Sequence, residues 1–265
     1  NFVLLGYRAY DIEGEGEQAT LEVERGSGLG ILRTESRSAW AEPVPLESIS
    51  EELRRRVLGP MLIISKTNAE STVHRRARMD YIGVKKLDEE GGVVGERRFL
   101  GLFTSKAYAE HADVIPILRD KLEAILRRSG APPGSHDYKE IITIFNSMPK
   151  EDLFQASLEE LDREVQTVLG LLFSDEVQVS LRPDPLGRGV SVMVILPRGR
   201  FSGEVRQRIQ EALVERFQGE VLNYFLAMSA GDQARLHFYL SARSETLRAV
   251  SPDEIEQQIR QLIRS

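Results

Sequence analysis

The chain has 265 residues, of which 41% are hydrophobic and 29% charged, and its formal net charge is −6 at pH 7. This composition is typical of a globular protein without membrane helices, and the negative charge argues against a partner bound mainly through phosphate contacts, such as nucleic acid. The absence of cysteine excludes disulfides, thiolate zinc sites and cysteine nucleophiles, and it favours a reducing, cytoplasmic location.

The first half of the sequence predicts an antiparallel sheet with a covering helix. Strand patterns occupy residues 2–33, 60–65, 78–88 and 93–105. The turn DEEGG at 88–92 predicts a hairpin, because glycine supplies a positive φ. Residues 36–59 contain prolines followed by a short helical pattern, and a longer helical pattern at 114–130 ends at Gly130. We expect residues 1–130 to form one α+β domain.

The second half alternates helix and strand patterns behind a stiff polar joint, APPGSH. Helical patterns cover residues 157–173 and 202–218, and strand patterns cover 176–183, 189–197, 220–229 and 234–242. This α-ββ-α-ββ order predicts two helices on one face of an antiparallel sheet, as in ferredoxin-like and ACT-type regulatory domains. We therefore expect a linker with a short helix at 131–150 and an ACT-like α+β domain at 151–245.

The last residues, 246–265, predict a helix that continues into a longer polypeptide. Ser251 is suited to the N-cap, Pro252 to the first helical position and Glu254 to a capping box. The apolar stripe of this helix comprises Ile255, Ile259, Leu262 and Ile263. Because no glycine stop follows and nothing downstream can cover the stripe, we expect the start of a truncated helical segment.

The sequence contains no complete nucleotide-binding or metal-binding motif. The run RGSGLGIL has glycines at 26, 28 and 30, but the dinucleotide fingerprint needs the third glycine at the position of Ile31. No P-loop pattern occurs. The histidines His74, His111, His136 and His237 are scattered, without the spacing of metal ligands. We expect no catalytic, cofactor-binding or metal-binding residue in this chain.

One stretch, KTNAESTVHRRARMDYIGVK, nevertheless gathers side chains that are common in active sites. The candidate ligand or interdomain contacts are Lys66, Asn68, Ser71, Thr72, His74, Arg75 and Arg78. A hydrolase using Ser71 and His74 would need a G-x-S-x-G elbow and an orienting carboxylate, and neither is found. Asn, Ser and Thr here favour turns and caps, whereas the arginines offer guanidinium groups to carboxylates on another surface. We prefer a fold-organising or interdomain role to a small anionic ligand site, and either to catalysis.

Long stretches of the chain resemble a known family. They read ISKTNAESTVHRRARMDYIGVKKLDEEGGVVGERRFLGLFTSKAY, IPILRDKLEAIL, GSHDYKEI, MPKEDLFQ and VSLRPDPLGRGVSVMVILPRGRF. In this order they closely resemble the amino-terminal region of the large bacterial NAD-specific glutamate dehydrogenases. One departure is Arg76, where the family commonly has proline.

The resemblance implies a place in a larger enzyme. In that family, a string of ACT-like and PAS-like domains precedes helical segments and the catalytic core. The resemblance implies that the first domain is PAS-like or ACT-like, the second is ACT-like, and the dinucleotide fold lies beyond Ser265. NAD would then belong to the parent enzyme, which converts L-glutamate to 2-oxoglutarate and ammonia by oxidative deamination. Implied partners are the rest of the polypeptide, further copies in a homo-oligomer and an amino-acid effector.

Two main hypotheses for function follow. The preferred one is a non-catalytic regulatory and assembly segment, in which an effector binds two arrangements of associated ACT-type sheets differently. The alternative is a self-contained sensor of an amino acid or another small molecule. The sequence leaves open whether the first domain encloses a pocket or fills its interior with its own side chains.

Overall fold

The computed structural model describes residues 1–14, 16–34, 42–184, 189–228 and 232–264. Residues 35–41, 185–188 and 229–231 lie outside the described residues, and they include the connections between predicted strands near 185–188 and 229–231 and the start of the segment 36–59. The chain divides into two compact units, unit 1 at Asn1–Glu110 and unit 2 at His111–Ser265. The expected domain boundary near residue 130 thus falls inside unit 2.

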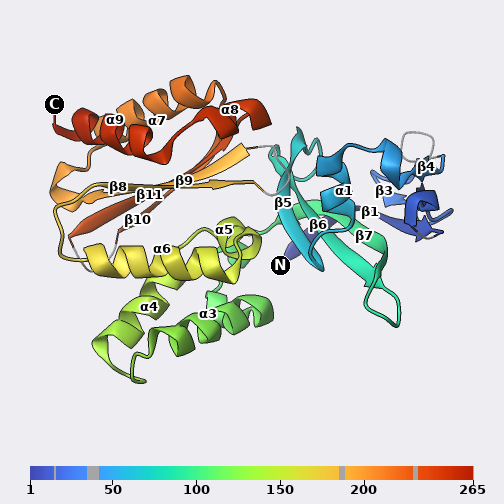
Figure 1. The fold of residues 1–265 in the computed structure, drawn as a ribbon, viewed down its shortest axis with the longest axis horizontal. Coiled ribbons are helices and arrows are strands. Elements are labelled where there is room, and N and C mark those ends of the chain that lie inside the picture. Colours follow the sequence, from blue (N-terminus) through green and yellow to red (C-terminus); the bar gives the residue numbers. More distant parts are fainter. Residues whose placement is uncertain (15, 35–41, 185–188, 229–231, 265) are drawn as a thin grey trace. The chain divides into compact units, whose positions relative to one another are not determined.

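Unit 1 is built on an antiparallel sheet, which has seven strands in the described residues (Figure 1). The strands are β1 (Phe2–Glu13), β2 (Thr20–Val23), β3 (Leu29–Gly30), β4 (Val44–Pro45), β5 (Leu62–Glu70), β6 (Arg78–Leu87) and β7 (Val93–Phe103). Their order is β4-β2-β1-β7-β6-β5, with β3 paired to β1. The predicted hairpin between β6 and β7 is confirmed: Asp88 accepts hydrogen bonds from the Glu90 and Gly92 amides, and Gly91 has φ +86°.

Charged and aromatic side chains occupy one face of the unit 1 sheet. Arg98 stacks on Tyr10, with its guanidinium carbon 4.3 Å from the ring centroid, and on Tyr81 at 5.3 Å. Glu96 binds the Arg98 guanidinium at 3.1 Å and pairs with the buried Lys85 ammonium. This part of the interior is therefore filled by the protein's own side chains. The PAS-like assignment of unit 1 stays a prediction.

Short helical elements complete unit 1, and longer helices open unit 2. Unit 1 has α1 (Glu51–Val57), α2 (Ser105–Ala109) and the 3-10 turns Gly16–Gln18 and Leu46–Ser48. Unit 2 begins with the 3-10 turn Ala112–Val114, followed by α3 (Pro116–Ser129), α4 (His136–Asn146), α5 (Lys150–Gln155) and α6 (Leu158–Leu171). The predicted stop of α3 at Gly130, which has φ +66°, and the Ser157–Glu160 capping box of α6 are both confirmed.

Helix α3 packs with its neighbours in unit 2, so the prediction that it covers the first sheet was wrong. Its buried residues Leu118, Leu122 and Ile125 share one core with α4 and α6. The periodicity of an amphipathic helix shows that one face is buried, but not against which element. We call α3 to α6 the helical layer.

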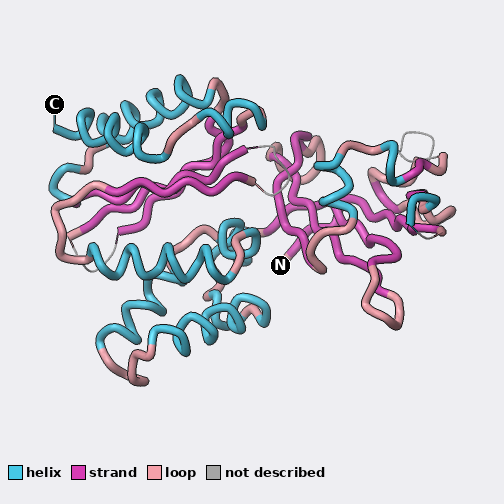
Figure 2. Tube along the Cα trace, in the orientation of Figure 1, coloured by secondary structure: helices cyan, strands magenta, loops and turns pink. Residues whose placement is uncertain are grey.

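The sheet of unit 2 is covered on both faces (Figures 1 and 2). Its strands β8 (Gln178–Pro183), β9 (Gly189–Pro197), β10 (Val221–Met228) and β11 (Gln233–Ser241) are antiparallel in the order β10-β11-β9-β8. The helices after β9 are α7 (Gly203–Phe217), α8 (Ser244–Ala249) and α9 (Pro252–Arg264), with a 3-10 turn at Arg198–Arg200. Figure 1 shows α7 and α9 over one face and α6 over the other.

The expectation that the two predicted helices lie on one face of this sheet was therefore wrong. The two predicted helices do not share a face, because α7 contributes Ile209 and Leu213 to one core while α6 belongs to the core that contains Met193 and Ile195 of the opposite face. Strand β9 is buried at every position, so its sequence does not show which face each helix covers.

The apolar stripe of α9 is also covered. Ile255, Ile259 and Ile263 are at most 9% exposed and pack in the same core as α7 and the sheet. The partner of this stripe therefore precedes it in the sequence, and residues 252–264 complete the sandwich with α7.

In the described part of the chain, no helix has the length and apolarity needed to span a membrane.

Candidate functional site

The predicted site residues lie around the β5–β6 hairpin of unit 1, and Lys66 anchors this hairpin. Its ammonium pairs with the buried carboxylate of Asp80 and donates a hydrogen bond to the Tyr108 hydroxyl at 2.8 Å. The other Asp80 oxygen accepts from the Phe103 amide at 2.7 Å. Lys66 thus ties β5 to β6 and to α2, the helix after β7, and Asp80 extends this network to β7.

Ser71 and His74 take part in the turn rather than in a shared hydrogen bond. The buried Ser71 hydroxyl donates to the Val73 carbonyl at 2.6 Å and accepts from the Val73 amide at 3.2 Å. His74 is exposed and has a left-handed backbone with φ +67°. Thr72 is exposed as well. The backbone of the turn therefore engages the hydroxyl that a hydrolase would use as its nucleophile.

The arginines of this hairpin form local contacts. Arg75 donates to the Phe103 carbonyl at 2.8 Å, and Arg78 stands opposite Glu70 in the β5–β6 register. Asn68 lies in β5, but its side chain is outside the described residues. The contacts of Lys66, Ser71 and Arg75 favour the fold-organising interpretation, which stays a prediction for the set as a whole.

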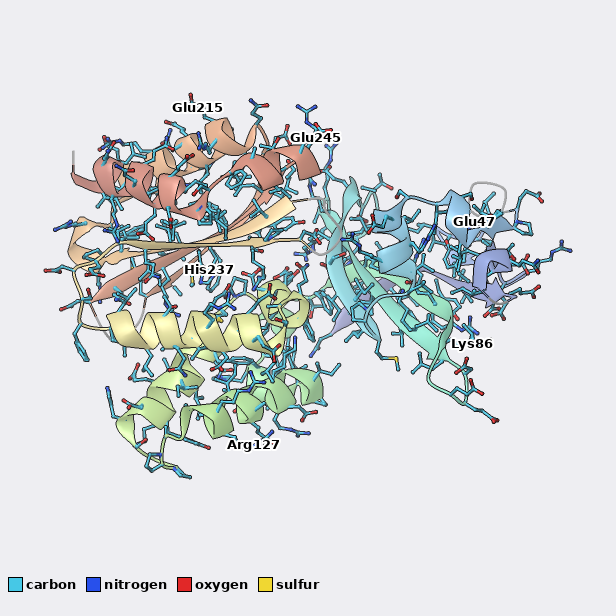
Figure 3. The ribbon with its side chains drawn as sticks, viewed as in Figure 1. Glu47, Lys86, Arg127, Glu215, His237 and Glu245 are labelled. Carbon is cyan, nitrogen blue, oxygen red and sulfur yellow. The ribbon has the colours of Figure 1, made fainter. Side chains whose placement is uncertain are left out.

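A second group of polar side chains, which sequence reasoning missed, lies between the helical layer and the unit 2 sheet. We call it the Asp152 cluster, and it consists of Asp152 of α5, Glu164 of α6, Arg182 of β8, Ser191 of β9 and His237 of β11. Figure 3 shows His237 on the side of the sheet that faces α6. The cluster connects five elements of unit 2.

Strand register places the three sheet residues on one face. Arg182 stands opposite Ser191, and Met193, two residues along β9, stands opposite His237. Because alternate residues of a strand share a face, all three side chains reach toward the helical layer.

Asp152 is the centre of the cluster. One of its oxygens binds the Arg182 guanidinium at 2.5 Å and accepts from the Ser191 hydroxyl at 2.8 Å. Its other oxygen lies 3.6 Å from His237 Nδ1. Arg182 also reaches a Glu164 oxygen at 3.4 Å. Since Ser191 bonds to the carboxylate and not to the imidazole, the arrangement lacks the hydroxyl-to-histidine step of a catalytic triad.

Burial and neighbouring charges shift the pKa values of the cluster. Burial raises the pKa of Glu164 to about 7, although the Arg182 charge opposes this. Burial also disfavours the Asp152 charge, but His237 and Arg182 outweigh it and lower the pKa of Asp152. Burial lowers the pKa of His237 despite the nearby Asp152 carboxylate. At neutral pH, the cluster therefore contains a charged Asp152–Arg182 pair beside an imidazole held neutral.

Lys121 of α3 holds the helix that carries Asp152. Its ammonium donates to the carbonyls of Leu153, Phe154 and Ala156 at 2.8, 3.2 and 2.8 Å. These carbonyls lie at the carboxyl-terminal end of α5, where a cation is favourable. Lys121 thus positions α5, and with it Asp152, over the sheet.

Little in the sequence points to this cluster. A charged residue in the strand pattern VSLRP and a histidine in RLHFYL are the only local signals. Each is equally expected for an exposed side chain or for a buried side chain whose hydrogen bonds are satisfied. The partners are 9 to 85 residues apart in the sequence, as the positions of Asp152, Arg182, Ser191 and His237 show. Among the described residues, no group of three or more His, Cys, Asp or Glu side chains is arranged to hold a metal ion.

Comparison with known families and proteins locates the chain. Residues 115–172 match the family model "Glutamate dehydrogenase, helical motif 1", and residues 178–265 match "Glutamate dehydrogenase, ACT2 domain". The first range covers the whole helical layer, and the second covers the sheet with α7 to α9. The Asp152 cluster therefore joins two separately recognised parts of the family.

Similar proteins carry one name. The chain is 30% identical over 265 residues to the NAD-specific glutamate dehydrogenase of Pseudomonas aeruginosa, and this covers 100% of the chain and 16% of the relative. For the NAD-specific glutamate dehydrogenase of Halomonas elongata, identity is 33% over 248 residues, with 92% and 15% covered. That of Mycobacterium tuberculosis is 28% identical over 243 residues, with 90% and 13% covered. The chain thus spans less than one fifth of the length of these relatives. Together with the two domain models, these matches show that the chain belongs to the large NAD-specific glutamate dehydrogenase family and corresponds to a part of its amino-terminal region.

Proposed function

We propose that the chain is a non-catalytic regulatory and assembly segment of an NAD-dependent glutamate dehydrogenase, which deaminates L-glutamate oxidatively to 2-oxoglutarate and ammonia. The observation that carries this proposal is the Asp152 cluster. Its charged groups bind one another between the helical layer and the ACT-like sheet, so they hold two parts of the fold together. The names of the relatives supply the parent reaction, and the cysteine-free composition supports a cytoplasmic location.

The edges of the unit 2 sheet support the assembly part of this proposal. At the β8 edge, the Val179 amide donates to the Glu256 carboxylate at 3.1 Å, and the Val177 carbonyl accepts from Arg260 at 3.1 Å. Helix α9 thus supplies hydrogen-bond partners for backbone groups along this edge. These contacts disfavour the pairing of β8 with a strand of another molecule.

The β10 edge has the opposite character. No residue of Val221–Met228 is charged, and Tyr224, Phe225 and Met228 are 50%, 44% and 43% exposed. Edge strands that lack charges and prolines readily pair with another strand. We propose that the partner is a second copy of the chain, because two uncharged strands can pair about a two-fold axis without bringing like charges together.

Catalysis by the chain alone tests the proposal directly. We expect the purified 265-residue chain, mixed with L-glutamate and NAD, to produce no NADH. The physical reason is that the relatives are more than six times longer, and the rest of the parent polypeptide is proposed to hold the redox site. NADH formation that depends on L-glutamate would contradict a non-catalytic segment.

Assembly is tested by placing a charge on the β10 edge. We expect Phe225→Lys to convert a dimer to a monomer in light scattering, because strand pairing would bring two buried ammonium groups together. Phe173→Lys is a matched control, since Phe173 is 85% exposed and lies in the turn after α6. A wild-type chain that stays monomeric at high concentration would contradict the proposed edge pairing.

A self-contained sensor remains the second candidate function. The observation that favours it is a row of buried polar atoms on β11 for which the described residues supply no hydrogen-bond partner.

A further inference from the structure

The two faces of the unit 2 sheet carry different kinds of buried side chain. The face that packs on α7 and α9 is apolar, and it contributes to their core Val190, Val192, Val194, Leu196, Leu236 and Phe238. The face toward the helical layer holds Met193 and Ile195 beside five buried polar residues, which are Arg182, Ser191, Gln233, Arg235 and His237. In Figure 1 this second face is the α6 side of the sheet. The contact of the helical layer with the sheet is therefore the more polar of the two.

A polar contact of this kind is weaker than an apolar contact of the same size. Apolar burial is the main favourable term in folding, whereas a hydrogen bond adds little net stability and an unmade buried one is costly. Both sides of the contact also keep a core of their own. Leu118, Ile141 and Val165 join α3, α4 and α6, and the sheet is held by α7 and α9. Because proteins open locally where stability is low, the helical layer can leave the sheet while both remain folded.

Two carboxylates share one guanidinium at this contact. Arg182 lies 2.5 Å from an Asp152 oxygen and 3.4 Å from a Glu164 oxygen, and all three side chains are at most 14% exposed. When both carboxylates are ionised, the three groups carry an uncompensated negative charge, and when Glu164 is protonated they are neutral. Since an uncompensated buried charge is costly, the docked layer favours the protonated form of Glu164, whereas water does not.

The charges around Glu164 leave this preference in place. Burial raises the pKa of Glu164 from its ordinary value of 4.5 to about 7. The carboxylates of Asp152 and Glu160 act in the same direction, and the guanidinium groups of Arg182 and Arg163 oppose them. Further charged and titratable groups of the contact are Lys121 of α3, Glu140 of α4, and Arg235 and His237 of β11.

We propose that the Asp152 cluster is a proton-dependent latch between the helical layer and the sheet. The layer stays docked while Glu164 carries a proton, and it parts from the sheet when Glu164 releases that proton to water. This inference rests on the regulatory role proposed above and gives that role a signal, the pH near neutrality. The two parts that the latch joins are those that match the helical motif and the ACT2 domain of the family.

The 265-residue chain has no cysteine, so a single introduced thiol reports the opening. Met193→Cys places a thiol on the face toward the helical layer, and Val194→Cys places one on the face toward α7 and α9, both at buried positions. The rate of alkylation by iodoacetamide is measured between pH 6 and pH 8, with wild-type Glu164 and with Glu164→Gln. Dividing the two rates at each pH cancels the titration of the thiol and of His237, which both backgrounds share.

For Met193→Cys, we expect the ratio of the Glu164 rate to the Glu164→Gln rate to rise about tenfold between pH 6 and pH 8. The reason is that the docked and open states bind the Glu164 proton with pKa values of about 7 and 4.5. For Val194→Cys the ratio should stay constant, because opening of the latch leaves that face covered. Glu159→Gln, a change at an exposed carboxylate of the same helix, should leave the wild-type pH dependence unaltered.

A ratio for Met193→Cys that does not change with pH would overturn the proposal. An equal rise for Val194→Cys would do the same, because it would show that unit 2 unfolds as a whole. Glu164→Leu, which is likewise uncharged, decides the question if Glu164→Gln does not fold. None of these rates depends on NADH formation or on light scattering, so failure of the latch is distinguishable from failure of the regulatory and assembly role.

Discussion

Replacing Arg182 with leucine is expected to destabilise unit 2 by about 3–5 kcal/mol, the usual cost of leaving one partner of a buried ion pair without the other. Arg182 and Asp152 side chains are only 7% and 14% exposed, so water cannot replace the lost guanidinium. Urea unfolding of the chain, followed by circular dichroism, measures the change in the free energy of unfolding. Because unit 1 folds around its own sheet, its transition should not move.

A surface pair provides the matched control. Arg128 of α3 reaches Glu159 of α6 at 3.0 Å, but these side chains are 42% and 65% exposed. Exposed pairs contribute roughly 0–1 kcal/mol, so Arg128→Leu should have a small effect. The double change Arg182→Leu with Asp152→Leu should recover much of the lost stability, because it also removes the Asp152 carboxylate that the single change leaves buried without its partner. Equal small effects of Arg182→Leu and Arg128→Leu would show that the Asp152 cluster does not hold the helical layer.

Glu164→Gln is expected to remove a pH dependence of stability. Folding raises the pKa of Glu164 from its ordinary value of 4.5 to about 7, so between these values the folded state binds more protons than the unfolded state. The stabilisation from protonated Glu164 is thus fully present below about pH 4.5 and is lost as the pH rises through about 7. The shift corresponds to on the order of 3 kcal/mol, and the Glu164 side chain is only 14% exposed.

The measurement is the free energy of unfolding of wild type and Glu164→Gln between pH 5 and pH 8. The lowered pKa values of Asp152 and His237 give contributions of the opposite sign, which are lost as the pH falls. Comparing the two proteins largely cancels these contributions, because both retain Asp152 and His237. We expect the variant to be more stable than wild type above pH 7, with the difference shrinking toward pH 5. A difference that does not change with pH would contradict a buried, proton-binding Glu164.

The sequence could predict contacts between residues that are close together in the chain. The Ser157–Glu160 capping box and the glycine stop at Gly130 use side chains and backbone within one turn, so residue type and spacing suffice. The turn role of Ser71 is of the same kind, since its hydroxyl bonds to a residue two positions away. Most strands of the two sheets likewise lie within predicted strand patterns, whereas β4 (Val44–Pro45) lies in the segment 36–59, for which no strand was predicted.

The sequence could not predict the Asp152 cluster, because its members are far apart in the chain. Asp152 and His237 are 85 residues apart, and they meet only because α5 is laid over the strand that carries His237. A single charged residue in a strand is as compatible with an exposed edge as with a buried pair. Its meaning depends on the partner that packing brings to it.

The sequence by itself determined the α+β class and the limits and caps of most helices and strands, because these depend on the local spacing of residues. It also determined the family, because sequence segments along the chain resemble those of the family. Only the tertiary structure decided that α3 packs in unit 2, that α6 and α7 cover opposite faces and that α9 closes the second core. An apolar stripe shows that one face of a helix is buried. The hydrophobic effect is not directional, so the stripe does not show which surface the face packs against.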